Sequence, residues 1–326
     1  MRTLRIGTRG SQLALWQAQT VAARIEQAGG PACQLVIIKT SGDRLSEASL
    51  PEAGGKRLFV KEIEDALFRG QVDLAVHSAK DLPADLPGGL AVAGTLPRED
   101  PRDALVLPSA TGPVAGVDEA LGALGDAPRL GTSSVRRVAQ LVRLLPRARF
   151  EAIRGNLDTR LRKLDQGQTD ALVLAAAGLR RLGLVDRISA VLPVAACVPA
   201  PGQGIVAVEI RADDDVARRT VSRIDDRTAS ATLAAERALV AALGGGCQLP
   251  LGALARPREG AAGLDTLDLH AIVVSLDGAR TIRAHEAGPF DAPEALGRSV
   301  ARKLAAGGAM AVLDEARRAR DGGPRP

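Results

Sequence analysis

The alternation of apolar and polar residues divides the first two thirds of the chain into strands and helices. Residues 4–7 form a short predicted strand that turns at Thr8-Arg9-Gly10 into a helix, and Ser11 is a suitable N-cap for it. A strand rich in β-branched residues follows over 33–39, then a helix over 59–68 and a strand over 72–76, ending in a turn from His77 to Asp81. Strand, helix and strand at this spacing predict a parallel α/β sheet.

A similar pattern begins again after a region rich in Pro and Gly near residues 108–128. We expect strands over 129–131, 149–153 and 171–175, with helices that begin at Ser133 and at Asn156. Residues 198–204 contain two prolines and two glycines and are interpreted as a crossing back to the first lobe, where 205–210 adds a strand.

The last third of the chain has a different pattern. It predicts helices over 216–224 and 230–243, a hairpin of strands 267–276 and 281–285 that turns at Asp277-Gly278, and a helical end broken at 307–308.

The predicted fold class is therefore α/β, with two α/β lobes and a small C-terminal α+β domain. We expect domain 1 at 1–103 and 199–215, domain 2 at 104–198 and domain 3 at 216–326. The polar, Gly-rich stretch 40–57 is interpreted as a long loop and a candidate lid.

Composition and charge narrow the choice of partners. The 326 residues are 46% hydrophobic and 25% charged, as in an ordinary globular protein, but only 2% are aromatic, so few side chains could stack on single-stranded nucleic acid. The net charge is +5, and the segment from Arg136 to Lys163 contains nine basic residues and only two acidic ones. This favours an anion-binding cleft over a surface that binds anions non-specifically. We therefore expect no nucleic-acid partner. Without a signal region or an apolar span, we expect a cytoplasmic protein that does not bind membranes.

Hydroxyl and guanidinium groups gather at three predicted strand-to-helix turns. The carboxyl ends of the strands in an open α/β sheet are where ligands bind, and helix N-termini favour anions. Several such sites indicate a ligand with several carboxylates or phosphates. For Arg136 and Arg137 the alternative is that the side chains point to solvent. The turns are Thr8-Arg9-Gly10-Ser11, Thr132-Ser133-Ser134-Val135-Arg136-Arg137, and Arg154-Gly155-Asn156 with Arg160 downstream.

Lysine is scarce in this chain, which has 37 Arg and 6 Lys, so its positions carry information. Lys56, Lys61 and Lys80 lie in or beside the candidate lid and the turn after residue 76, where a compact ammonium group could be needed. Chance clustering is the alternative. Asp81 follows Lys80 and could stabilise a developing cation or transfer a proton, or it could simply cap the turn.

The cysteines and histidines, three of each, have no disulfide or metal-ligand spacing, so we expect no metal. Cys33 and Cys197 lie in apolar surroundings and are interpreted as packing residues. Cys247 follows Gly244-Gly245-Gly246, so its thiol would be presented on a loop that a large molecule can reach. A structural or idle thiol is the alternative.

Taken together, these motifs resemble the porphobilinogen deaminase (hydroxymethylbilane synthase) family over nearly the whole chain. Each motif alone is weak, but their common order is highly specific. They are Thr8-Arg9-Gly10-Ser11, Ala14-Leu15-Trp16-Gln17-Ala18, Gly54-Gly55-Lys56, Leu58-Phe59-Val60-Lys61-Glu62, Ala75-Val76-His77-Ser78-Ala79-Lys80-Asp81, Arg98-Glu99-Asp100-Pro101-Arg102-Asp103-Ala104, Gly131-Thr132-Ser133-Ser134-Val135-Arg136-Arg137, Arg154-Gly155-Asn156, Pro201-Gly202-Gln203-Gly204 and Gly245-Gly246-Cys247-Gln248.

The resemblance implies a transferase of tetrapyrrole biosynthesis with two lobes like those of solute-binding proteins. Cys247 would hold a dipyrromethane cofactor through a thioether. Four porphobilinogen molecules would be added to it head to tail, each releasing ammonia, before hydroxymethylbilane is released by hydrolysis. The family is usually monomeric. A binding protein for a polycarboxylate, without catalysis, is the alternative, but it leaves Cys247 without a role.

The resemblance also implies roles for individual residues. Asp81 would face pyrrole N–H groups and, with Lys80, would be catalytic. Glu52 and Arg57 depart from some members and leave the lid contacts open. The cofactor would be held by Lys80, Asp81, Thr132, Ser133, Ser134, Arg136, Arg137 and Arg160, and the substrate by Arg9, Ser11, Lys56, Arg154 and Arg181.

Overall fold

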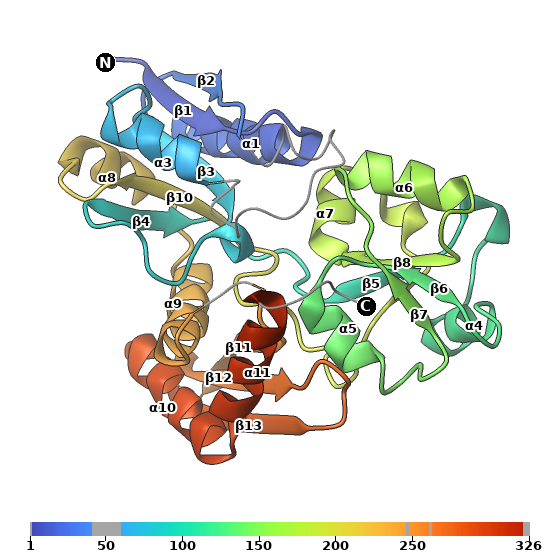
Figure 1. The fold of residues 1–326 in the computed structure, drawn as a ribbon. Coiled ribbons are helices and arrows are strands. Elements are labelled where there is room, and N and C mark those ends of the chain that lie inside the picture. Colours follow the sequence, from blue (N-terminus) through green and yellow to red (C-terminus); the bar gives the residue numbers. More distant parts are fainter. Residues whose placement is uncertain (1, 41–59, 246–247, 261–262, 322–326) are drawn as a thin grey trace.

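The first lobe is a five-stranded sheet covered by helices on both faces (Figure 1). The structure, a computed structural model, describes residues 2–40, 60–245, 248–260 and 263–321. The core between the sheet and helices α1 and α8 contains Ile6, Leu74 and Val21, while α3 packs on the other face through Ile63. The strand order is β2 (Cys33–Ile37), β1 (Leu4–Thr8), β3 (Leu74–Ser78), β10 (Val206–Arg211) and β4 (Leu90–Thr95), with helices α1 (Gln12–Gln27), α3 (Lys61–Phe68) and α8 (Asp215–Val221).

This sheet is mixed, whereas the sequence predicts a parallel one. β1 pairs in parallel with β2 and β3, as expected, but β10 runs antiparallel between β3 and β4. β3 also extends two residues beyond the predicted strand end, because His77 pairs with Ala207 and Ser78 with Val206. The predicted turn is thereby shortened to a single 3₁₀ helix, η2 (Ala79–Asp81), which places Lys80 and Asp81 directly at the end of the strand.

The second lobe repeats this arrangement. β5 pairs antiparallel with both β8 and β9, while β6 pairs in parallel with β7 and β8. Its two apolar cores lie on opposite faces of the sheet. The strand order is β7 (Arg149–Glu151), β6 (Arg129–Gly131), β8 (Ala171–Ala175), β5 (Asp103–Val106) and β9 (Ala190–Val191), with helices α4 (Val117–Gly122), α5 (Val135–Leu141), α6 (Leu157–Asp165) and α7 (Ala176–Arg181).

The C-terminal unit is a three-stranded antiparallel sheet whose inner face packs on three helices. The predicted hairpin is confirmed, with Gly278 at φ +75° in its turn, and the predicted helix break falls at Gly308, at φ +90°. The strands are β11 (Leu251–Gly260), β12 (Gly263–Val274) and β13 (Thr281–Pro289), and the helices are α9 (Arg227–Ala242), α10 (Pro293–Ala306) and α11 (Ala309–Asp321).

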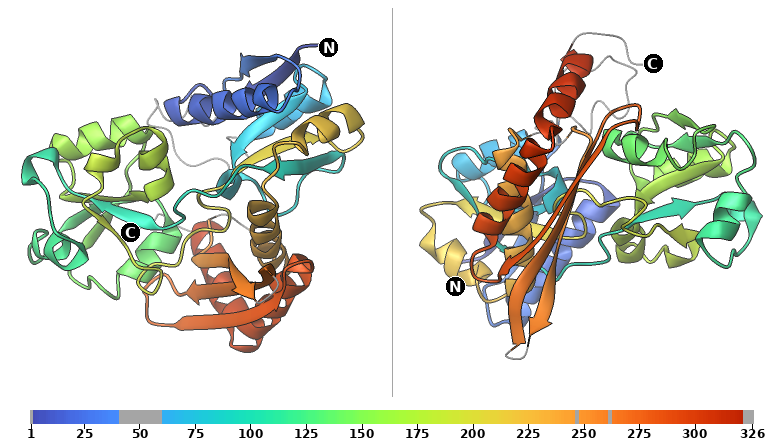
Figure 2. Two further views of the ribbon diagram at one scale, coloured as in Figure 1. Left: turned by 180° about the vertical axis from the view of Figure 1, so that it is seen from behind. Right: turned by 90° about the horizontal axis from the view of Figure 1, so that it is seen from below.

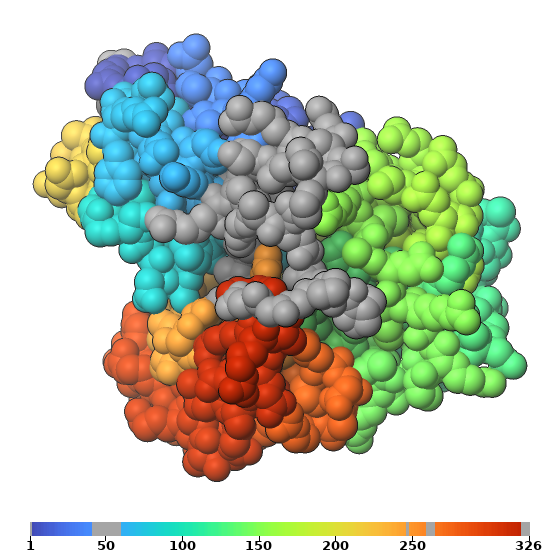
Figure 3. Space-filling model, viewed as in Figure 1, coloured from blue at the N-terminus to red at the C-terminus, as the bar shows by residue number. Residues whose placement is uncertain are grey.

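The chain crosses between the two lobes twice, once between β4 and β5 and once between β9 and β10. Figures 2 and 3 show the lobes side by side and the C-terminal unit against both of them. The predicted fold class is thus confirmed. The exact domain boundaries stay predictions, and we propose that domain 1 extends beyond residue 215, because Val221 and Ile224 pack in the core of the first lobe. No helix in the described ranges is both long and apolar enough to cross a membrane.

Candidate active site

In the first lobe, the predicted site residues follow the carboxyl ends of two neighbouring parallel strands. Arg9 and Ser11 follow β1, while Lys80 and Asp81 follow β3. Ser11 caps α1, since its Oγ accepts a hydrogen bond from the backbone N–H of Ala14 at 3.3 Å. Both turns therefore open on the same edge of the sheet, as expected for an α/β ligand site.

The turn that carries Asp81 rests on the crossing segment 201–204. The backbone N–H of Ala79 donates to the carbonyl of Ile205 at 2.9 Å. Gly202 has φ +73°, and a Cβ placed there would lie 3.0 Å from the carbonyl carbon of Ala79 and 3.0 Å from the nitrogen of Lys80. Only glycine fits this position without displacing the turn.

In the second lobe, three hydroxyl residues shape the turn between β6 and α5. Ser134 is the N-cap of α5, and Thr132 Oγ1 accepts a hydrogen bond from the N–H of Ser134 at 3.3 Å. Ser133 is exposed, and its Oγ donates to the carbonyl of Ile153 at 2.8 Å, which ties this turn to the next one. The sequence predicts all three as cofactor contacts, and the structure places them together at one strand end.

Arg136 and Arg137 do not point to solvent. They are 4% and 6% exposed, and both bind the fully buried Asp103. Arg136 Nη1 lies 2.7 Å from Oδ2 of Asp103, and Arg137 Nε lies 2.9 Å from Oδ1. Burial alone would raise the pKa of Asp103, but the two guanidinium groups outweigh it and hold that pKa well below its usual range. Their predicted contact with cofactor carboxylates stays a prediction.

Two further side chains complete the surroundings of Asp103, and the sequence gives no binding role to any of the three. Gln203 Nε2 donates to Oδ1 of Asp103 at 2.9 Å, and Cys197 Sγ lies 3.3 Å from Oδ2. Burial, and then the charge of Asp103, raises the pKa of Cys197 to about 12, so this thiol stays protonated and packs as predicted. The signal that could have identified Asp103 is its place in the motif Arg98–Ala104.

Arg160 is a cation without a close anionic partner. Its Nε donates to the carbonyl of Gly155 at 2.8 Å, and it forms no ion pair with another described residue. Its pKa is lowered to about 10, mainly by burial and then by the nearby charge of Arg137, while Asp81 acts in the opposite direction. Because Asp81 belongs to the first lobe and Arg160 to the second, this interaction brings the two predicted halves of the site together.

Arg181 also reaches from the second lobe to the first. Its Nη2 donates to the carbonyl of Gly204 at 2.6 Å, and its guanidinium lies 5.6 Å from the ring centre of Trp16 on α1. Burial lowers its pKa to about 10, with Glu99 opposing that change. A second guanidinium is therefore desolvated where the lobes meet.

The remaining predicted residues either lie at least partly exposed or fall outside the described residues. Arg9 is partly exposed and Arg154 is exposed, each at the strand-end turn that the sequence predicts. Lys56 and Cys247 lie outside the described residues, as does nearly all of the candidate lid 40–57, including Glu52 and Arg57.

A buried glutamate on α9 links the C-terminal unit to this site, and the sequence did not indicate it. Glu236 accepts hydrogen bonds from Arg98 Nη1 at 2.6 Å, from the N–H of Gly202 at 2.6 Å and from the N–H of Ala255 at 2.7 Å. Arg98 Nε in turn donates to the carbonyl of Gln203 at 2.9 Å. The segment that supports the Asp81 turn is thus fixed to the unit that carries Cys247.

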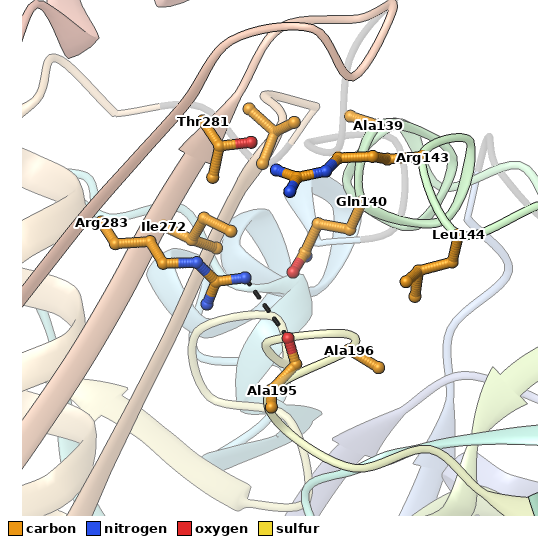
Figure 4. Close-up of a pocket in the computed structure, with 10 residues that line it drawn as sticks. Ala139, Gln140, Arg143, Leu144, Ala195, Ala196, Ile272, Thr281 and Arg283 are labelled. Atoms are coloured by element: carbon orange, nitrogen blue, oxygen red, sulfur yellow. Dashed lines mark hydrogen bonds between the residues drawn. The ribbon is translucent and has the colours of Figure 1, made fainter. Parts of the chain in front are cut away.

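One cavity of about 200 Å³ lies elsewhere, between α5, the segment near Ala195 and strands β12 and β13 (Figure 4). None of the predicted site residues lines it. Arg143 and Arg283 point toward it from the second lobe and from the C-terminal unit.

The arrangement suits a ligand with several carboxylates. Moving a cation out of water is costly unless an anion compensates it, and Arg160 and Arg181 are both desolvated without a salt bridge in the described part of the chain. Arg136 Nε is also buried without a hydrogen-bond partner there. These observations fit a polycarboxylate such as a dipyrromethane, whose negative charge the guanidinium groups would neutralise.

Comparison with family models agrees with this interpretation. A family model described as "Porphobilinogen deaminase, dipyromethane cofactor binding domain" matches residues 4–219, and one described as "Porphobilinogen deaminase, C-terminal domain" matches residues 230–306. Among solved structures, immunogenic lipoprotein A from Vibrio vulnificus has 13% identity and a TM-score of 0.42, covering 70% of this chain and 96% of that one. The periplasmic VFT2 domain of BvgS from Bordetella pertussis has 14% identity and a TM-score of 0.40, covering 68% and 86%.

Curated relatives are similar over almost their entire length. The porphobilinogen deaminase of Desulforudis audaxviator is 46% identical over 318 residues, 97% of this chain and 98% of the relative. That of Geobacter metallireducens is 44% identical over 315 residues, 96% and 95% of the two chains. The chain therefore belongs to the porphobilinogen deaminase family.

Proposed function

We propose that the chain catalyses the hydroxymethylbilane synthase reaction of tetrapyrrole biosynthesis, with porphobilinogen as its substrate. Four porphobilinogen molecules are condensed head to tail, and hydroxymethylbilane is released by hydrolysis. The observation that carries the proposal is that Arg160 of the second lobe lies near enough to Asp81 of the first for their charges to interact, while Arg181 contacts the first lobe through Gly204 and Trp16. When bound through Cys247, a dipyrromethane supplies the free pyrrole position at which each chain begins.

The basic residues bind and orient acidic side chains. Each pyrrole of porphobilinogen carries an acetate and a propionate, so a growing chain accumulates negative charge that desolvated guanidinium groups neutralise. Arg160 is the strongest candidate on the second lobe because its charge has no close anionic partner among the described residues. The proposed cofactor contacts are Lys80, Thr132, Ser133, Ser134, Arg136, Arg137 and Arg160, and the proposed substrate contacts are Arg9, Ser11, Lys56, Arg154 and Arg181.

Asp81 is the proposed catalytic carboxylate, with Lys80 beside it. In each condensation the C–N bond of the aminomethyl group breaks, and the nitrogen takes up a proton and leaves as ammonia. A C–C bond then forms at a pyrrole carbon, which loses its own proton. Positive character develops on the substrate as ammonia leaves, and a carboxylate fixed at that point stabilises it. The same carboxylate can hold the proton that the attacking ring gives up.

We also propose that the protein acts as a cytoplasmic monomer on a small-molecule substrate, without nucleic-acid or membrane partners. The mixed charge distribution and the scarcity of aromatic side chains support this.

Intact-mass spectrometry of the purified protein tests the proposal. The wild type is expected to be heavier than its sequence by one dipyrrolic adduct, which Cys247→Ser loses and Cys33→Ser keeps. Cys33 is a suitable control because its thiol is partly accessible and lies outside the proposed site. Incubation with porphobilinogen should then yield uroporphyrin from the wild type and none from Cys247→Ser. A protein that carries the adduct-free mass and still condenses porphobilinogen would contradict the proposal, and binding without product would favour a binding protein.

A further inference from the structure

Two of the three histidines come together on the outer face of the C-terminal sheet, together with an aspartate. His270 on β12 and His285 on β13 are directly opposite each other in the strand register. Their rings stack with centroids 4.1 Å apart and planes at 25°. Asp268 lies two residues before His270 and so on the same face. Its Oδ2 is 3.1 Å from Nε2 of His270, and its Oδ1 is hydrogen-bonded to Nε2 of His285.

We propose that these three side chains form a surface site for a zinc ion. One ligand atom of each residue lies within 4.8 Å of the others, so two imidazole nitrogens and one carboxylate oxygen converge on one point. Two nitrogens and one oxygen are a ligand set that Zn²⁺ accepts, and a fourth position would remain open to water. All three residues are partly or well exposed, so the ion can enter from solvent.

The sheet holds the site in place. His270 and Asp268 alternate with Leu267 and Leu269, which are fully buried in the core beneath the sheet, so neither strand can slip without exposing that core. An ion held by both strands would join β12 to β13 across their register. The stability of this hairpin should therefore increase when zinc binds.

Two cations border the site and limit its affinity. Arg256 on β11 is opposite Asp268, and Arg283 on β13 lies two residues before His285, opposite Ile272. Both are exposed, and Arg283 Nη2 is directed toward the carbonyl of Ala195 at 3.3 Å (Figure 4). Ile272 and Arg283 also line the cavity between the second lobe and the C-terminal unit, so the zinc site would lie beside that cavity.

Calorimetric titration of ZnCl₂ into the full-length holoenzyme tests the proposal. A Cys33→Ser background removes a competing thiol. We expect one equivalent of zinc to bind, and we expect His270→Gln, His285→Gln and Asp268→Asn each to weaken binding by about tenfold or more. Asp314→Asn is the matched control, because Asp314 is an exposed carboxylate of the same unit that pairs with Arg317. It should bind zinc like the wild type.

Proton NMR gives a readout that needs no variant, because the chain has three histidines. Zinc should shift the imidazole signals of two of them and leave the third, from His77, unchanged. That ring is buried, with its Nε2 3.1 Å from Glu209. The proposal is overturned if zinc shifts no imidazole signal, if it shifts only that of His77, or if both histidine variants bind zinc as tightly as the wild type.

Discussion

At the scale of single residues, the candidate site is defined by positive charges that the described residues do not fully neutralise. Arg136 and Arg137 share the buried Asp103, whereas Arg160 has only the carbonyl of Gly155 within hydrogen-bond distance among the described residues. Its lowered pKa of about 10 still leaves it charged at neutral pH. Arg160 is therefore a cation that costs stability until an anion binds.

Replacing Arg160 with Gln should separate binding from stability. We expect the melting temperature to stay unchanged or to rise, because a desolvated charge is removed. Turnover of porphobilinogen, measured as kcat/KM, should fall by roughly 10–100-fold, since a charge-assisted hydrogen bond contributes about 1.5–3 kcal/mol. Arg162→Gln, on the exposed side of the same helix, is the control and should match the wild type. Equal activity in the two variants would remove Arg160 from the site.

Asp81→Asn tests the proposed catalytic carboxylate. The side chain keeps its shape but loses its charge, so we expect the fold and the adduct mass to be retained while kcat falls by about 10²-fold or more. Asp85→Asn provides the comparison, because Asp85 is an exposed carboxylate four residues further along the chain. Single-turnover kinetics and intact mass together measure both effects. Normal turnover in Asp81→Asn would exclude a catalytic role.

At this scale the sequence predicted most of the strand-end turns that carry the candidate site residues, because such turns can be found from local pattern and motif. It could not show that Arg136 and Arg137 turn inward, since their partner Asp103 lies more than thirty residues away. The contact between Arg98 and Glu236 could not be predicted for the same reason: nothing near Glu236 in a helix rich in alanine indicates that it also binds Gly202.

At the scale of secondary-structure elements, most strands were predicted, but β4, β5, β9 and β11 were not. β5 begins with the buried Asp103. An aspartate is more typical of a loop than of a buried strand, and its arginine partners are not apparent from the sequence. β11 contains Pro257 and was missed, although an edge strand tolerates proline and β11 pairs only with β12. The direction of β10 depends on which strands it joins, and this is set by the double crossing of the chain.

Gly202→Ala should show how the crossing segment positions the catalytic turn. Alanine would have to adopt φ +73° and place its Cβ 3.0 Å from the backbone of Ala79 and Lys80. We expect a loss of about 1–3 kcal/mol in the free energy of unfolding, because the left-handed conformation is strained for alanine. We also expect a lower kcat as the Asp81 turn moves.

Gly88→Ala is the matched control for this substitution, since a Cβ at Gly88 meets no atom within 4 Å and its φ is ordinary. Urea unfolding and steady-state kinetics measure both variants. If Gly202→Ala loses stability but keeps its kcat, the crossing segment supports the fold and does not position Asp81.

At the scale of the whole molecule, two buried carboxylates connect parts of the chain that the sequence treats as separate. Glu236 joins the C-terminal unit to Arg98 and Gly202, and Asp103 joins α5 to Gln203 in the second crossing. A tethered cofactor would need its anchor, its anion sites and Asp81 to stay in register. These connections hold the Asp81 turn and the second lobe against the C-terminal unit, and none of them follows from local sequence.

The acid stability of the molecule should depend on Asp103. Its pKa in the folded protein is held well below the unfolded value of about 3.9, because Arg136 and Arg137 outweigh the effect of burial. A carboxyl with a lowered folded pKa contributes stability at pH values above its unfolded pKa, and that contribution is lost as the pH falls below it. In Asp103→Asn the contribution is absent at every pH, and two buried guanidinium groups lose their counter-ion.

We therefore expect Asp103→Asn to unfold more easily than the wild type near neutral pH, by about 3–5 kcal/mol, the usual cost of breaking a buried ion pair. The difference should shrink as the pH is lowered through about 3.9. Urea unfolding of both proteins across this range measures it, with Asp126→Asn as the control, because Asp126 pairs with Arg147 on the exposed surface. A difference that stays constant with pH would mean that Asp103 acts through its shape and hydrogen bonds and not through its charge.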